Sequence, residues 1–219
     1  NIIGFQNILD CSRNYGIEHL LYASSSSVYG GNTKTPFSEK DSVNHPVSIY
    51  AATKKSNELF AHAYSHLYKI PVTGMRFFTV YGPWGRPDMA IWQFTDLILK
   101  KKPIKVFHKG ILSRDFTYID DIIIGIKSAI SYNIKNKVNK HSIFNLGNNS
   151  PISVNKTIGL LEKILGRKAN KKFLPMQLGD VKATYADITK TKKELDFEPK
   201  TSIEEGLKNF TSWFKDYKK

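Results

Sequence analysis

The hydrophobic and polar positions along the chain predict strands that alternate with amphipathic helices. Residues 19–23 and 71–77 form short apolar runs, which are typical of strands buried in a parallel sheet. A helix is expected between them, beginning close to Tyr50 and ending near Tyr68. Because parallel strands need a crossover connection, this order of strand, helix and strand predicts an α/β fold.

A further helix is expected at residues 2–15. Ile3, Ile8 and Leu9 form its apolar side, and Gly16 ends it. Patterns and helix-start signals in the rest of the chain predict helices at 90–101, 119–132, 153–166, 188–195 and 202–217, strands at 104–107 and 142–147, and loops at 33–46 and 133–140. The last helix carries Phe210, Trp213 and Phe214, and we expect it to dock onto the core rather than onto a membrane.

Composition narrows the class of protein. Of 219 residues, 41% are hydrophobic and 12% aromatic, enough to bury a core, so the chain is not expected to be disordered. No apolar run is long enough for a transmembrane helix, so no membrane partner is expected. Cys11, the single cysteine, cannot form an internal disulfide, which fits a reducing cytoplasm. The six histidines lack metal-ligand spacing, so no metal is expected.

The net charge of +14 is the feature that would suggest a nucleic acid. The lysines are scattered, however, and aromatic residues are not interleaved with them as a stacking surface requires. Nucleic acid is therefore not expected as a partner. An anionic small-molecule substrate gives some of the positive charge a use.

Tyr50 and Lys54 carry the clearest chemistry in the chain. Residues four apart on a helix lie on one face, one turn from each other. A nearby ammonium favours the phenolate over the phenol, so a tyrosine beside a lysine can act as a proton acceptor. By itself the spacing is weak, because a half-buried tyrosine beside a solvated lysine has the same pattern.

A run of four serines, residues 24–27, ends the first predicted strand. By itself it is most simply a polar loop or a helix cap. Brought beside Tyr50, one of its hydroxyls would complete a group that handles protons during the oxidation of an alcohol. The carboxyl ends of both predicted strands are also where open α/β sheets bind ligands.

With these residues, the chain resembles the extended short-chain dehydrogenases/reductases, in the branch of NAD-dependent nucleotide-sugar epimerases and dehydratases. Within that branch it is most similar to the UDP-glucuronate 4-epimerases. The resemblance is carried by SSSSVYG at 24–30, YAATK at 50–54, RFFTVYGPWGRPDMA at 76–90, RDFTYIDD at 114–121 and PMQLGDV at 175–181. These motifs span nearly the whole chain in the order of the family.

One family motif is missing from these residues. The family begins with a strand, a glycine-rich G-x-x-G-x-x-G turn and a helix, which hold the pyrophosphate of the dinucleotide. We expect the chain to lack roughly the first ninety to one hundred residues of the family, so that this piece alone is inactive.

The resemblance implies a catalytic role for Ser25, Tyr50 and Lys54. In the family, the tyrosine removes the proton of the sugar C4 hydroxyl, the lysine supports it, and the serine bridges substrate and tyrosine. NAD is the implied cofactor. The implied cofactor-binding residues are Asn1, Ser24, Tyr50, Lys54, Phe77 and Phe78.

The resemblance also implies which sugar is bound. Ser26 and Ser27 stand where dehydratases carry acidic residues, so elimination lacks its carboxylates. With Ser25, they are expected to contact the sugar. Thr79 matches a sugar-contacting position, and Arg86 matches the arginine that faces the C6 carboxylate of glucuronate, because a guanidinium suits a carboxylate. Arg86 could instead be a surface residue of a Gly/Pro loop.

For the nucleotide, the implied residues are Phe107 on uracil, Arg114 on the diphosphate, and Gln177 and Asp180 at the ribose. Phe107 could instead be part of the core, and Arg114 could form a local ion pair with Asp115.

The fold expected from all of this is a Rossmann-type doubly wound parallel sheet with a smaller α/β substrate-binding domain. Residues 1–79 and 117–147 are assigned to the NAD-binding part, and residues 80–116 and 148–219 to the substrate part. The implied function is 4-epimerisation of UDP-glucuronate for a surface polysaccharide. Alternatives are a UDP-hexose or UDP-N-acetylhexosamine 4-epimerase, and a non-catalytic fragment that binds a sugar nucleotide.

A homodimer is also implied, because family members pair through two adjacent helices. Here these would be residues 2–15 and 47–69, with Phe5, Leu9, Phe60 and Tyr64 as candidate interface residues. The same residues could instead fill the core of the monomer.

Overall fold

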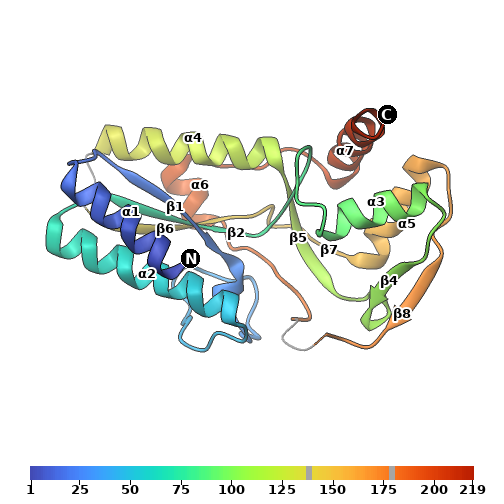
Figure 1. Ribbon diagram of the computed structural model, residues 1–219, viewed down its shortest axis with the longest axis horizontal. Coiled ribbons are helices and arrows are strands. Elements are labelled where there is room, and N and C mark those ends of the chain that lie inside the picture. Colours follow the sequence, from blue (N-terminus) through green and yellow to red (C-terminus); the bar gives the residue numbers. More distant parts are fainter. Residues whose placement is uncertain (137–139, 178–180) are drawn as a thin grey trace.

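The computed structural model describes residues 1–136, 140–177 and 181–219. Its first lobe is built on a parallel sheet in the order β1-β2-β6 (Figure 1). The strands are β1 (Leu20–Ser25), β2 (Val72–Phe77) and β6 (His141–Leu146). The pairing places Ser25 beside Phe77 and Phe77 beside Leu146, so the carboxyl ends of all three strands meet at one edge.

Helices cover both faces of this sheet. Figure 1 shows α1 and α2 on one face and α4 on the opposite face. Their bounds are Ile2–Asn14, Ile49–Tyr68 and Ile119–Asn136. Under α4, Ile122 and Ala129 pack against Met75 and Phe144 of the sheet. The predicted α/β fold with a parallel, Rossmann-type sheet is therefore confirmed.

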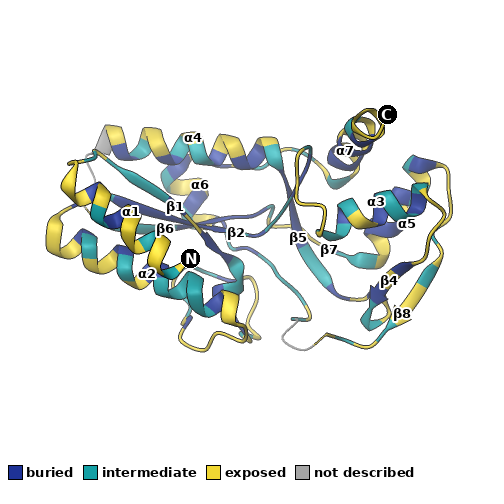
Figure 2. Cartoon of the chain, in the orientation of Figure 1, coloured by how far each residue is buried: buried dark blue, intermediate teal, exposed yellow. Residues whose placement is uncertain are grey.

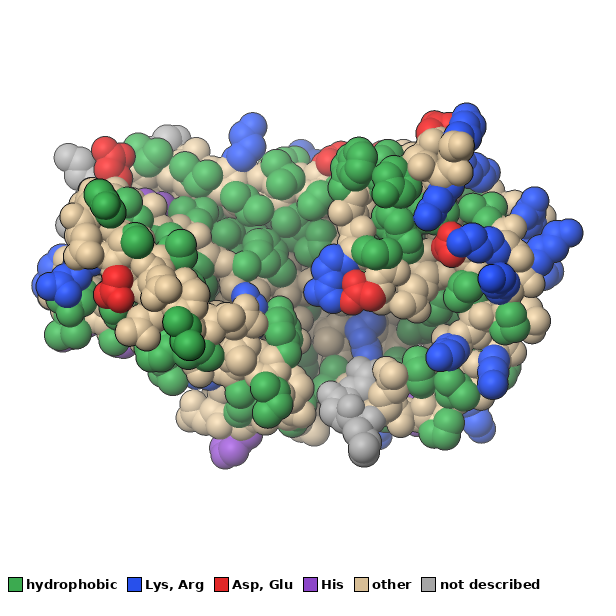
Figure 3. Space-filling model, in the orientation of Figure 1, with side chains coloured by type: hydrophobic (Ala, Val, Ile, Leu, Met, Phe, Trp, Pro, Cys, Tyr) green, Lys and Arg blue, Asp and Glu red, His purple; other side chains and the backbone are tan. Residues whose placement is uncertain are grey.

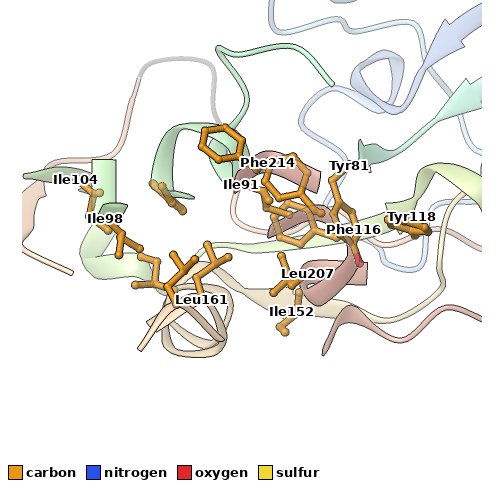
Figure 4. Close-up of a cluster of buried hydrophobic side chains, with 14 of the residues drawn as sticks. Tyr81, Ile91, Ile98, Ile104, Phe116, Tyr118, Ile152, Leu161, Leu207 and Phe214 are labelled. Atoms are coloured by element: carbon orange, nitrogen blue, oxygen red, sulfur yellow. The ribbon is translucent and has the colours of Figure 1, made fainter. Parts of the chain in front are cut away.

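The second lobe contains two small sheets. One has the order β3-β5-β7, and the other pairs β4 with β8. The strands are β3 (Thr79–Tyr81), β4 (Ile104–Phe107), β5 (Ser113–Tyr118), β7 (Pro151–Ser153) and β8 (Lys171–Leu174). The helices that pack on them are α3 (Ala90–Leu99), α5 (Val154–Leu165) and α7 (Ile203–Tyr217). Their apolar side chains meet in one core, part of which is drawn in Figure 4.

The predicted helices and strands are present, with small shifts at their ends. The sequence did not predict β3, β5, β7 or β8, because strands of three to six residues with charged or polar members show little periodicity. The predicted loop at 133–140 is wrong at its start, because α4 continues to Asn136. There the Asn133 side chain is buried and donates to Thr73 Oγ1 at 2.9 Å. Residues 137–139 lie outside the described part of the chain.

The apolar side predicted for the first helix is wrong at two of its three positions. Leu9 is fully buried, but Ile3 is 75% exposed and Ile8 is 52% exposed. The buried face of α1 is formed by Leu9 and Ser12, with Phe5 packed on Tyr22 of β1. Exposed residues run along the outward faces of α1 and α2 in Figure 2.

The predicted division of the chain differs from the structure in one segment. The sequence predicts that residues 148–219 all belong to the substrate part. Helix α6 (Thr189–Leu195) instead lies with the parallel sheet, because Leu195 and Phe197 share a core with Phe144 and Leu146. The chain therefore returns to the first lobe before α7 joins the second.

The carboxyl-terminal helix docks as the sequence predicts. Phe210 and Phe214 of α7 are almost fully buried, and Trp213 packs on Trp92 of α3. Across the described residues, no helix combines the length and apolar character that crossing a membrane requires.

His141 is a partly buried titratable group at the start of β6. Its Nε2 lies 2.9 Å from the hydroxyl of Tyr22. Burial, and to a smaller extent His62 close by, lower the pKa of His141 to about 4. The folded state therefore keeps this imidazole neutral, whereas the unfolded chain takes up a proton near an ordinary value of about 6.5.

This difference predicts an acid-sensitive fold. Between about pH 6.5 and 4 the unfolded state binds the extra proton, so the free energy of unfolding should fall by up to about 1.4 kcal/mol per pH unit from this group. His141→Gln should reduce that slope in urea unfolding series measured across this range. Replacing the exposed His45 by Gln is the matched control and should leave the slope alone. Equal slopes for wild type and His141→Gln would contradict the assignment.

Candidate active site

The candidate site lies where the parallel sheet ends and the second lobe begins. β1 ends in the serine run, and β2 ends at Phe77, directly before Phe78 and the start of β3 at Thr79. Figure 3 shows that the face between the two lobes is hollowed, with Lys and Arg side chains beside the hollow. Open α/β sheets bind ligands at this edge.

Ser25 shapes the turn that follows β1. It caps the short 3₁₀ helix η1 (Ser26–Tyr29), and its Oγ accepts from the Ser27 amide at 3.1 Å. The same Oγ donates to Ser27 Oγ at 3.1 Å. The interpretation of the serine run as a helix cap is therefore confirmed for Ser25, and its role in proton handling stays a prediction.

Ser24 points the other way. Successive residues of a strand face opposite sides, and the Ser24 hydroxyl is buried and donates to Glu58 Oε1 at 2.7 Å. Ser24 thus contacts the interior of the first lobe in this structure. Its expected contact with a cofactor stays a prediction.

Tyr50 and Lys54 are held by the first turns of α2. Ser48 caps this helix by accepting from the Ala51 amide at 3.1 Å, so Tyr50 lies in the first turn, 49% exposed. One turn later, Lys54 Nζ donates to the Ala23 carbonyl of β1 at 2.8 Å. Burial lowers the pKa of Lys54. The expected tyrosine–lysine pair therefore stands beside the serine run.

Asn1 joins this group from the start of α1. Its side-chain amide donates to Thr53 Oγ1 at 3.0 Å, and its carbonyl accepts from Asn57 at 2.9 Å. Both partners are on α2, which fixes Asn1 beside the turn that carries Lys54. Phe77 is partly buried, and Phe78 is buried against Tyr29 and Phe37.

Two adjoining cavities extend from the serine run into the second lobe. The first, which we call the inner cavity, has a volume of about 190 Å³ and is lined by Ser26 and Ser27. The second, which we call the outer cavity, has a volume of about 230 Å³ and is lined by Phe107. Thr79 and Arg114 line both, so the cavities meet at these two residues. The first is mostly polar and the second mostly apolar in character, with Phe94, Phe116 and Val154 among its other walls. Together they suit a ligand with a polar end and an aromatic end.

Arg86 lies in the loop between β3 and α3. It is largely exposed, and its guanidinium forms a bidentate pair with Asp88, in which Nε donates to Oδ1 at 3.0 Å. The pKa of Arg86 is raised, chiefly by this carboxylate. Arg86 is therefore an exposed loop residue paired with Asp88 in this structure, and its contact with a sugar carboxylate stays a prediction.

Asp115, next to Arg114, accepts backbone hydrogen bonds from two other segments. Its carboxylate is fully buried and accepts from the amides of Asn148, Asn149 and Ala186 at 2.9, 3.2 and 2.9 Å. Burial raises its pKa against the effect of these amides. Asp115 therefore supports the walls of the first cavity rather than serving mainly as a local partner for Arg114.

The two residues expected at the ribose, Gln177 and Asp180, line neither of these cavities as described and stay predictions. Gln177 is exposed in the segment that follows β8, and Asp180 lies outside the described residues. Among the residues that are described, no group of three or more His, Cys, Asp or Glu could hold a metal ion.

The sequence reasoning missed a buried ion pair beside the site. Arg76 of β2 donates to Glu58 of α2 from Nε and Nη2, at 2.8 and 2.9 Å. Two signals could have revealed it. Glu58 lies four residues after Lys54 on the same helix face, and Arg76 is a charged residue inside an otherwise apolar strand, which requires a partner.

Comparison with known proteins gives a consistent family. Residues 1–147 match the model of the NAD dependent epimerase/dehydratase family. Over 236 aligned residues the chain is 48% identical to Protein CapI of Staphylococcus aureus, covering all of this chain and 70% of that protein. It is 50% identical over 227 residues to UDP-glucuronate 4-epimerase 5 of Arabidopsis thaliana, covering 98% of this chain and 52% of that enzyme.

A similar solved structure is the UDP-glucuronic acid 4-epimerase of Bacillus cereus in complex with UDP-glucuronic acid and NAD. It has a TM-score of 0.91 and 36% sequence identity, with 99% of this chain and 67% of that one covered. The chain thus spans between about half and about 70% of the length of the relatives it matches.

Proposed function

The chain belongs to the NAD-dependent epimerase/dehydratase family, and from that premise we propose that the full-length protein is a UDP-glucuronate 4-epimerase, which interconverts UDP-glucuronate and UDP-galacturonate. The observation that carries the proposal is the pair of cavities joined at Thr79 and Arg114, the inner of which is also lined by Ser48, the cap of the helix that carries Tyr50 and Lys54. We assign the activity to the cytoplasm and its product to precursor synthesis for a surface polysaccharide.

The described residues fit one end of NAD. A nicotinamide ribose needs hydrogen-bond donors at the carboxyl edge of the sheet, and Lys54 and Tyr50 present an ammonium and a hydroxyl there, with Asn1 fixed alongside by α2. Phe77 and Phe78 close the end of β2. When bound, NAD supplies a reversible hydride acceptor for the sugar C4.

The protein groups handle the proton that accompanies this hydride. Tyr50 accepts the proton of the C4 hydroxyl, and the nearby Lys54 ammonium stabilises the charge that the tyrosine carries before the transfer. Ser25 directly precedes Ser26 and Ser27, which line the inner cavity, and its hydroxyl is the group that we expect to bridge the sugar and Tyr50. Loss of the O4 proton and of the C4 hydride leaves a 4-keto sugar, and the epimer forms when the hydride returns to the opposite face of C4 and a proton returns to O4.

Ser26 and Ser27 restrict the reaction to this epimerisation. Both line the inner cavity, and neither can act as a carboxylate acid or base. Elimination of water from the 4-keto sugar needs such groups. The hydroxyls instead suit hydrogen bonds to the sugar.

The outer cavity suits the nucleotide. Phe107 offers an aromatic face for a base, and Arg114, which lines both cavities, is placed to meet a diphosphate between base and sugar. In the described structure Phe107 is only partly buried, which favours the binding role over a role in the core. Gln177 and Asp180 remain candidates for the ribose.

Arg86 is the residue that would select an acid sugar. It lies in the loop between β3 and α3, a few residues after Thr79, which lines both cavities, and a guanidinium fork suits a carboxylate. Because Arg86 pairs with Asp88, it could serve only to support its loop. The second candidate function is therefore that of a UDP-hexose or UDP-N-acetylhexosamine 4-epimerase. A fragment that binds a sugar nucleotide without turning it over is the remaining alternative.

The direct test is to incubate the full-length protein with UDP-glucuronate and NAD and to follow the anomeric proton signals by NMR. We expect UDP-galacturonate to accumulate to equilibrium. Tyr50→Phe tests the catalytic hydroxyl directly, because it removes one hydroxyl from a half-exposed side chain and should leave the fold unchanged. Turnover should fall by about a hundredfold or more. If Tyr50→Phe retained wild-type turnover, Tyr50 would have no part in the chemistry.

Substrate choice depends on Arg86. We expect Arg86→Ala to lower kcat/KM for UDP-glucuronate by about thirtyfold or more, because the carboxylate loses its cation, while UDP-glucose is nearly unaffected. Arg86→Lys should recover part of the loss, since an ammonium keeps the charge without the fork. Steady-state kinetics with both substrates checks this. Equal losses for the two sugars would mean that Arg86 supports the loop and does not select the acid.

Assembly as a homodimer through α1 and α2 is the third part of the proposal. Leu9 is buried inside the chain and cannot contribute, while Phe5, Phe60 and Tyr64 are partly buried. The exposed apolar residues on the two helices include Ile3, Ile8, Leu59 and Leu67.

These exposed residues predict a specific pattern of variants. We expect Leu59→Glu to convert a dimer into a monomer, because a charge would be buried at the interface. Ile124→Glu, at an exposed position on α4, is the control and should leave the dimer intact. Multi-angle light scattering at tens of micromolar measures both. A monomeric wild type would contradict the proposed dimer.

A further inference from the structure

The face of α2 that packs on the sheet lacks large apolar side chains. Its buried residues are Ala51, Asn57, Glu58, Ala61 and Ser65. Small residues let a helix lie close to a sheet, but they provide little interlocking along the helix axis. The largest of the buried side chains is a carboxylate. The position of α2 along the sheet is therefore defined mainly by polar contacts.

Glu58 makes those contacts with two strands at once. Its Oε1 accepts from Ser24 Oγ of β1 at 2.7 Å and from Arg76 Nε of β2 at 2.8 Å, and its Oε2 accepts from Arg76 Nη2 at 2.9 Å. All three residues are almost completely buried. The guanidinium also lies over the ring of Tyr29, 4.8 Å from its centre, directly under the turn that carries the serine run.

Stability alone does not explain this arrangement. Removing two charges from water is costly, and well-packed apolar residues of similar volume often stabilise a fold as well or better. Arg76 Nη1 is also buried without a hydrogen-bond partner among the described residues, which adds to the cost. What a bidentate pair provides is a defined distance and angle between the two elements that carry it.

The same helix face carries the proton-handling pair. Tyr50, Lys54 and Glu58 are spaced four apart, so all three lie on one side of α2 at successive turns. Lys54 reaches the carbonyl of Ala23, one residue before Ser24. Any shift of Glu58 along the strands would move Tyr50 relative to Ser25 by a similar amount, because the helix between them is continuous.

We propose that the buried Glu58–Arg76 pair is a positioning device for proton transfer, which fixes the distance of Tyr50 and Lys54 from the serine run. The expected effect on kcat rests on the proposed function. The expected effect on the position of α2 rests only on the contacts of Glu58. Glu58 and Arg76 are positioning residues, since they contact Ser24, Tyr29, Lys55 and each other, and neither lines the candidate cavities.

The main test uses the double variant Glu58→Gln/Arg76→Met in the full-length protein. It leaves no unpaired buried charge, and the amide oxygen introduced at position 58 can still accept from Ser24, so the fold should keep its melting temperature. We expect UDP to bind with an affinity within about twofold of wild type by calorimetry, because the nucleotide residues lie on other elements. We expect kcat for UDP-glucuronate to fall by about tenfold to a hundredfold, because a misplacement of about 1 Å is enough.

Glu58→Asp is the second variant, in case the double variant does not fold. It keeps both charges and withdraws the carboxylate by one methylene group, so it should also lower kcat by about tenfold while UDP affinity is unchanged. Lys55→Gln is the matched control. Lys55 approaches Glu58 from the outer side, 3.6 Å from Oε2 and partly exposed, and its loss should leave kcat unchanged.

A readout independent of turnover is the ring signal of Tyr50 in ¹³C-tyrosine NMR, assigned with Tyr50→Phe. It should shift or broaden in Glu58→Asp and in the double variant, and stay in place in Lys55→Gln. A folded variant with wild-type kcat and an unchanged Tyr50 signal would overturn the proposal. If wild type makes no UDP-galacturonate, the proposed function fails, and the Tyr50 signal alone then decides whether Glu58 positions this helix.

Discussion

The carboxylate of Asp115 joins three parts of the chain that are distant in sequence. Asp115 lies in β5. Its carboxylate accepts hydrogen bonds from the backbone amides of Asn148 and Asn149, in the turn after β6, and of Ala186, in the segment before α6. The amide of Asp115 itself donates to Thr184 Oγ1 at 3.2 Å. Because Thr184 and the neighbouring Arg114 both line the inner cavity, the shape of that cavity depends on this one buried anion.

Other buried carboxylates in the chain have the same role. Asp121, at the start of α4, accepts from the amides of Lys200 and Thr201, which lead into α7. Glu58 connects α2 to two strands. An anion that accepts several hydrogen bonds at once has a narrow range of allowed geometries, so each of these residues sets the place of a segment that carries few apolar contacts. The two lobes are thus joined by directional bonds as well as by packing.

The sequence was most informative where chemistry and periodicity are local. The parallel strands, the helices between them, and the tyrosine–lysine pair follow from spacings of a few residues, and the structure places Lys54 against the Ala23 carbonyl of β1, two residues before Ser25. The strands of the second lobe were missed, because residues such as Arg114 and Asp115 interrupt any apolar pattern. Ile3 and Ile8 were placed on the wrong side of α1, since an apolar stripe does not show which surface it meets. The other contacts that the sequence did not predict are between residues far apart in the chain. The Glu58–Arg76 pair joins residues 18 positions apart. The amides that donate to Asp115 lie about 33 and 71 residues later, and no sequence signal marks them.

Thr79 and Arg114 border both cavities, which limits how this scaffold can change its ligand over evolutionary time. A substitution at either residue alters the inner and outer cavity together, so gains for one end of a ligand come with changes at the other. Residues that border a single cavity, such as Ser26 at one end and Phe107 at the other, can vary without that coupling. A change of ligand at the inner end is therefore most accessible through the serine turn, while the residues between the cavities contact any ligand that spans both.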